Sequence, residues 1–146
     1  MAALPAMKQK TDPVAVPYGQ QPTQPLRPLV LIVESHKDTR DLLKTLLELN
    51  DYLVVEVGDG EQAIAQAEKV YPDIVLMDTN LPGLDGLAVT QWLRKHTSLH
   101  LVPIIITSGN AFPVFRSKAL AAGCNEFLVK PINFDQLDDI LKRYIS

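Results

Sequence analysis

A carboxylate stands directly after a short apolar run at Asp78, where the chain begins a loop rich in proline and glycine. Residues 74–77 are all apolar and predict a buried strand, and Leu81-Pro82-Gly83 supply the turn. In parallel α/β sheets, the crevice beyond the carboxyl ends of the strands is where ligands bind. A carboxylate in that place can attack phosphorus and form an acyl phosphate. We therefore interpret Asp78 as the chemically active residue of this chain.

Polar side chains also follow three of the other expected strands. A lysine ammonium can pair with a phosphoryl group, and a hydroxyl can hydrogen-bond one of its oxygens. Magnesium, bound by one or two carboxylates and by phosphate oxygens, would complete such a site. No glycine-rich phosphate loop follows the first strand, which argues against a nucleotide-binding fold. The polar residues are Glu34 and Ser35 after residues 29–33, Thr107 and Ser108 after residues 102–106, and Lys130 after residues 127–129.

Strand and helix patterns alternate from residue 29 onward and predict an α/β fold. An apolar run typical of a strand covered on both faces occurs at residues 29–33, and further strands are expected at residues 52–57, 74–77, 102–106 and 127–129. Helical periodicity predicts helices at residues 38–49, 61–70, 86–96, 112–122 and 134–145. In the first helix, Leu42, Leu43, Leu46 and Leu47 share the face expected to be buried. This alternation predicts a five-stranded doubly wound parallel sheet of order 2-1-3-4-5 with five helices, a flavodoxin-like three-layer sandwich.

The composition fits one globular domain preceded by a proline-rich tail. Residues 1–28 hold six of the eleven prolines, which predicts a disordered or polyproline-like tail before a domain at residues 29–146. A passive tail is favoured over a proline-rich ligand for a partner. The net charge of −3, without a basic patch, excludes a typical nucleic-acid binder. The single cysteine, Cys124, excludes a disulfide framework. No apolar run is long enough for a membrane span, so we expect a cytoplasmic protein.

The chain resembles the receiver domain of two-component response regulators from about residue 29 to residue 144. Three segments carry the resemblance, namely DIVLMDTNLPGLDG, IIITS and EFLVKPI, in this order and on expected strand ends. The resemblance implies that Asp78 accepts a phosphoryl group, that Lys130 pairs with it and that Thr107 senses it. It further implies a switching role for Phe127, a proline after the lysine whose peptide bond is usually cis, and a magnesium ion on Asp78 and on the backbone carbonyl of Asn80.

One departure from the family lies after the first strand, where an acidic pair is replaced by Glu34-Ser35. Ser35 takes the place of the carboxylate that binds the metal directly, and a serine hydroxyl is a poor magnesium ligand. We therefore expect weakly bound magnesium, held by Glu34, Asp78 and the Asn80 carbonyl, and slow or absent phosphorylation. Ser35 and Asp38 also match a capping box, which predicts that Ser35 starts the first helix.

Three functions stay open at this point. The first is a stand-alone receiver, not a conventional enzyme, that a histidine kinase or phosphotransfer protein phosphorylates on Asp78. We expect no effector domain after residue 146, and therefore output by protein binding, through residues 112–145, or by onward phosphotransfer. The second is a receiver-like interaction module that works without phosphate. The reason to consider it is Ser35, which stands in the place of a metal-binding carboxylate. The third is a small flavodoxin-like enzyme or cofactor binder, which the missing phosphate loop disfavours. The sequence names neither the kinase nor the downstream protein.

Overall fold

The computed structural model describes residues 26–145, in which five strands and five helices alternate. The strands are β1 (Leu29–Val33), β2 (Leu53–Val57), β3 (Ile74–Asp78), β4 (Ile104–Ser108) and β5 (Glu126–Val129). The helices are α1 (Lys37–Leu49), α2 (Gly60–Val70), α3 (Gly86–Lys95), α4 (Pro113–Ala122) and α5 (Phe134–Ile145). No helix in this part of the chain has both the length and the hydropathy needed to cross a membrane. The predicted tail at residues 1–28 lies outside the described residues, apart from 26–28.

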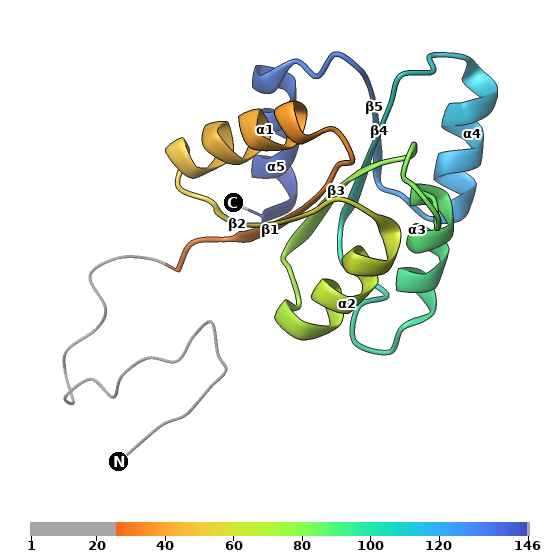
Figure 1. Ribbon diagram of the computed structural model, residues 1–146, viewed down its shortest axis with the longest axis horizontal. Coiled ribbons are helices and arrows are strands. Elements are labelled where there is room, and N and C mark those ends of the chain that lie inside the picture. The colour runs from red at the N-terminus through yellow and green to blue at the C-terminus, as the bar shows by residue number, and fades with distance from the viewer. Residues whose placement is uncertain (1–25, 146) are drawn as a thin grey trace.

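The strands form one parallel sheet that lies between two layers of helices. Its order is β2-β1-β3-β4-β5, so the predicted fold class and strand order are both confirmed. Helices α1 and α5 cover one face of the sheet, and α2, α3 and α4 cover the other (Figure 1). All five strands therefore end at the same edge of the sheet, which is the edge where the polar residues were expected to meet.

Each face of the sheet carries its own hydrophobic core. Leu31 and Val33 of β1 pack toward α2 and α3, whereas Val30 and Ile32 pack toward α1 and α5. Strands β1, β3 and β4 are buried along their whole length, because helices cover both faces of this part of the sheet. These central strands give the residues at their ends a rigid base.

Strand β4 begins two residues later than the sequence pattern predicted. Pro103 has no N–H to donate to the sheet, and its carbonyl accepts a hydrogen bond from Val75 just before the strand begins. The strand also extends farther than predicted, so that Thr107 and Ser108 end it instead of following it. Asp78 likewise ends β3, and it is paired directly with Thr107 in the sheet. The register alone thus brings the acid and the hydroxyl side by side.

The first helix differs from its prediction in two respects. Leu42 is 59% exposed although Leu43 beside it is buried, so the buried face of α1 is narrower than the leucine pattern indicated. The predicted capping box of Ser35 and Asp38 is wrong, because the N-cap residue is His36 and it makes no side-chain capping bond. The Ser35 hydroxyl is instead bonded to another loop, as described below.

Candidate functional site

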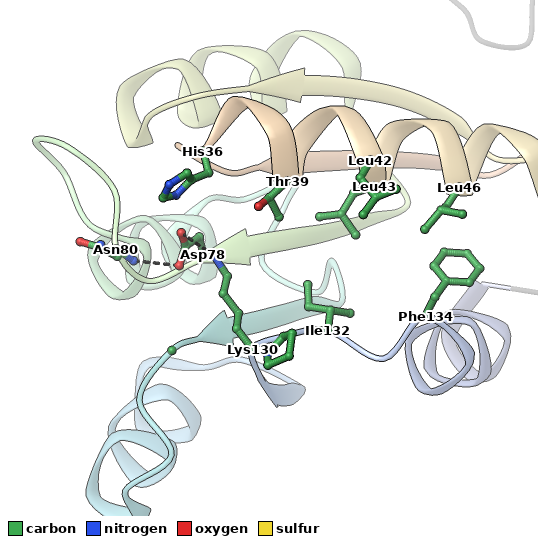
Figure 2. Close-up of a pocket in the computed structure, with 12 residues that line it drawn as sticks. His36, Thr39, Leu42, Leu43, Leu46, Asp78, Asn80, Lys130, Ile132 and Phe134 are labelled. Atoms are coloured by element: carbon green, nitrogen blue, oxygen red, sulfur yellow. Dashed lines mark hydrogen bonds and ion pairs between the residues drawn. The ribbon is translucent and has the colours of Figure 1, made fainter.

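Three charged side chains meet where β1, β3 and β5 end. The Lys130 ammonium lies 3.1 Å from Asp78 Oδ2 and 2.8 Å from Glu34 Oε1. Both carboxylates are buried, Glu34 being 2% exposed and Asp78 4% exposed. Figure 2 shows Lys130 reaching from the far side of a groove toward Asp78. The structure therefore brings together three of the residues that the sequence singled out, although long stretches of chain separate them.

Backbone N–H groups hold the two carboxylates in place. The Asn80 N–H donates to Asp78 Oδ1 over 3.1 Å, and the His36 N–H donates to Glu34 Oε2 over 3.0 Å. Together with the two bonds from Lys130, every carboxylate oxygen of the pair has a hydrogen-bond donor. Donors of this kind compensate a buried carboxylate for the water it has lost.

The loop after Asp78 is held by the start of helix α3. Asp85 caps this helix by accepting a hydrogen bond from the Ala88 N–H over 2.8 Å. Gly86 lies against the backbone of β3, and a Cβ atom there would collide with the carbonyl oxygen of Asp78. A glycine is therefore needed at the first turn of α3 to let the helix approach the phosphoacceptor candidate so closely.

Ser35 joins the two loops on either side of the site. Its hydroxyl donates to the backbone carbonyl of Asn80 over 3.2 Å, across 45 positions of sequence. This is the carbonyl that the family resemblance assigns to a metal ion. The Ser35 hydroxyl thus uses one of the two lone pairs of this oxygen.

The donor groups at this site do not fit a tightly held magnesium ion. Magnesium favours octahedral oxygen coordination, with carboxylates supplying the protein ligands. Among residues 26–145, no group of three or more His, Cys, Asp or Glu side chains is placed to hold a metal ion. Glu34 and Asp78 are both bonded to Lys130, and the hydroxyl of Ser35 donates to the carbonyl of Asn80. One anionic ligand is missing, and the existing ones already have cationic or N–H partners.

The two residues assigned to switching lie beside the site on β4 and β5. Thr107 is buried, and its hydroxyl donates to the carbonyl of Met77 at the edge of hydrogen-bonding distance, 3.5 Å. Phe127 is also buried and, with Phe115 of α4, lines a cavity of about 460 Å³ next to the loop after Asp78. Space thus exists on the α4 side of Phe127 into which side chains of this region can move.

An apolar groove of about 610 Å³ leads away from the site between α1 and the segment after β5. Asp78, Asn80 and Lys130 line the end of the groove that holds the site, and Leu46 and Phe134 lie farther along it (Figure 2). The Lys130–Pro131 peptide at its wall is cis. Sequence reasoning missed this groove, because it assigned Leu42 and Leu46 to the core. The remaining lining residues are His36, Thr39, Leu42, Leu43, Gly109, Pro131 and Ile132.

The pKa of Lys130 gives the site a pH dependence. Burial lowers this pKa, but hydrogen bonds to Glu34 and Asp78 outweigh burial, so it lies above its ordinary value of 10.5. A raised lysine pKa stabilises the fold below the unfolded pKa, and this stabilisation is lost as the pH rises through the folded pKa. We expect the free energy of unfolding to fall more steeply than in Lys130→Met as the pH rises from about 10 upward. Urea unfolding across this range measures it, and parallel curves for the two proteins would contradict it.

Comparison with known proteins shows that the folded part of the chain is similar to a single protein family. Residues 30–142 match the family model described as the response regulator receiver domain. The polar-differentiation response regulator DivK of Brucella ovis is 30% identical over 117 residues, which cover 80% of this chain and 95% of DivK. The receiver domain of sensor histidine kinase PA1611 from Pseudomonas aeruginosa PAO1, solved with a magnesium ion coordinated in its active-site cleft, is 36% identical with a TM-score of 0.76. That match covers 82% of this chain and 98% of the other.

A chemotaxis protein has a similarly close fold. The chemotaxis response regulator CheY4 of Vibrio cholerae superposes with a TM-score of 0.77 at 27% identity, covering 82% of this chain and 99% of CheY4. The matched regions thus span nearly the whole length of each relative. The family model covers every residue of the site described above, from Glu34 to Lys130.

Proposed function

The chain belongs to the response regulator receiver family, and from this membership we propose that a histidine kinase or a histidine phosphotransfer protein phosphorylates it on Asp78. One observation carries the proposal: the Asp78 carboxylate is buried at a strand end, with the Lys130 ammonium 3.1 Å away. Receiver domains are signalling domains, so we propose that the chain acts by changing its protein contacts and not by turning over a substrate. We also propose that it acts in the cytoplasm.

In the proposed reaction, a carboxylate oxygen of Asp78 attacks the phosphorus of the donor. A P–O bond forms, the bond from phosphorus to the donor's histidine nitrogen breaks, and the nitrogen leaves with the electron pair. Lys130 already lies against Asp78 and would pair with the incoming negative charge. Thr107 would exchange its long bond to the Met77 carbonyl for a phosphoryl oxygen. This exchange would move Thr107 inward and free space for Phe127, which is a local charge event acting on a two-state element.

Magnesium plays a reduced part in this proposal. We propose that it binds weakly, through Asp78, Glu34 and the Asn80 carbonyl, where it would add positive charge next to the phosphoryl group. The reason is the donor set, in which the Ser35 hydroxyl stands where the family has a carboxylate. Weak metal binding would make phosphorylation slow, which agrees with the expectation from the sequence.

The surface of α4, β5 and α5 is the proposed output face. Several apolar side chains are exposed on this surface, and clusters of exposed apolar residues often mark protein interaction sites. Helix α4 has only two buried residues, Ala119 and Ala122, so most of it is free to contact a partner. Phe127 lies just beneath this face, which gives a phosphoryl group a route to it. The exposed apolar residues are Phe112, Val114, Phe115 and Leu120 around α4 and Val129 of β5.

A second function is favoured by a separate observation. The site is satisfied without any ligand, because Ser35 bonds the Asn80 carbonyl and Lys130 neutralises part of the charge of two acids. A receiver-like interaction module that never uses phosphate would have such a site. The third possibility, a flavodoxin-like enzyme, gains nothing from the comparisons, since the relatives reported above are receivers and response regulators.

The two functions are separated by treating the full chain with acetyl phosphate and magnesium, or with a phosphorylated histidine phosphotransfer protein. The first predicts one added phosphoryl group per chain by intact mass, stable in acid and removed by hydroxylamine, as expected for an acyl phosphate. It also predicts shifted amide resonances for Thr107 and Phe127. An unmodified chain with unchanged spectra under both donors would favour the second function.

A further inference from the structure

The loops around Asp78 are tied together by bonds from the chain itself. We propose that Ser35 and Lys130 form a metal-independent clamp, which holds the loop after β1 and the loop after β3 in the arrangement that other receivers complete with a divalent cation. The proposal rests on the proposed function in treating Asp78 as the reactive group. The clamp itself is a property of the unphosphorylated protein and can be measured there.

The first part of the clamp is electrostatic. Two buried carboxylates, Glu34 and Asp78, face a single ammonium group, at 2.8 Å and 3.1 Å from its nitrogen. Buried anions this close require a cation, and Lys130 provides one charge for two acids. The three groups together carry a net charge of −1. A divalent cation would therefore meet a site whose negative charge is already half neutralised, and one oxygen of each carboxylate already accepts a bond from Lys130.

The second part of the clamp is a chain of hydrogen bonds. The Ser35 hydroxyl donates to the Asn80 carbonyl, and the Asn80 N–H donates to Asp78 Oδ1. Asn80 is thus held at both ends of its backbone, by Ser35 of the loop after β1 and by Asp78 at the end of β3. A carbonyl oxygen has two lone pairs, so the bond from Ser35 uses one of the two positions at which a metal could bind it.

The clamp predicts that Ser35→Asp behaves differently with and without a metal ion. Aspartate cannot donate to the Asn80 carbonyl, so the loops lose their link and the site gains a third anion. Ser35 is exposed, and the larger side chain can be accommodated. The variant should therefore become looser without metal and should bind magnesium more tightly. Ser35→Ala should loosen the loops without gaining metal affinity, which separates the two effects of the substitution.

The test uses the full-length protein with magnesium chloride alone and no phosphoryl donor. Magnesium titrations are followed through amide resonances, and thermal unfolding is measured with EDTA and with magnesium. Ser35→Asp should bind magnesium at least about tenfold more tightly than the natural chain and gain about 5 °C in melting temperature on adding it. Amide exchange at Asn80 should accelerate in both Ser35 variants in EDTA. Ser98→Asp, which adds a carboxylate at an exposed turn, should behave like the natural chain.

Two results would overturn the clamp. One is magnesium affinity in the natural chain within threefold of that in Ser35→Asp. The other is unchanged exchange at Asn80 in Ser35→Ala. Neither result bears on phosphorylation, because no donor is present. Conversely, if the chain behaves as expected here but is not phosphorylated by any donor, the clamp is supported and the proposed function is contradicted.

Discussion

Asp78→Asn is expected to lower phosphoryl transfer to the chain by at least about 100-fold. The substitution replaces a carboxylate nucleophile by an amide of the same size, and an amide oxygen carries no charge with which to attack phosphorus. The other carboxylate of the site, Glu34, keeps its bonds to Lys130 and to the His36 N–H in this variant. Phosphate incorporation from one donor, measured by intact mass or by radiolabel at several times, gives the rates.

Loss of folding would be a trivial reason for this result, and the structure argues against it. An asparagine at position 78 can still accept the hydrogen bond from the Asn80 N–H, and Lys130 keeps its 2.8 Å bond to Glu34. The free energy of unfolding should change by about 1 kcal/mol or less. The matched control is Asp85→Asn in the same loop, because asparagine caps helices as well as aspartate does. Phosphate on Asp78→Asn at a similar rate would assign the chemistry to another residue.

The parts of the site that depend on sheet geometry could be predicted from the sequence. Asp78, Thr107 and Lys130 each follow or end an apolar strand, and parallel strands necessarily bring such residues to one edge. The pairing of Asp78 with Thr107 follows from the register of β3 and β4. The two-residue error in β4 has a simple origin, since hydrophobicity marks Val102 and Pro103 as strand while proline cannot enter the ladder as a donor.

The parts that depend on distant side chains could not be predicted. Ser35 bonds a carbonyl 45 residues away, and its neighbours in sequence offer only the capping-box pattern, which the structure does not adopt. The bridge from Lys130 to Glu34 spans 96 residues, and local periodicity carries no information about it. Leu42 is similar: its spacing places it with the core leucines, yet the groove beside it exists only because the segment after β5 stands apart from α1.

Lys130→Met is expected to reduce the free energy of unfolding by about 2 to 3 kcal/mol at neutral pH. The substitution keeps much of the side-chain length but leaves the buried acids Glu34 and Asp78 facing each other without a cation. Removal of one partner of a fully buried pair costs somewhat more, and we lower the figure because Lys130 is 24% exposed, so water can reach the site. Urea unfolding monitored by circular dichroism measures the change.

A matched control and a rescue variant separate the charge effect from lost packing. Lys142→Met removes a lysine that pairs with Asp138 over 2.9 Å, but its side chain is 64% exposed, and the loss should stay below about 1 kcal/mol. Adding Glu34→Gln to Lys130→Met removes one of the two stranded charges and should recover part of the lost stability. If it recovers none, lost packing explains the effect. The charge balance proposed for the clamp would then be wrong, even if Asp78 still accepts phosphate.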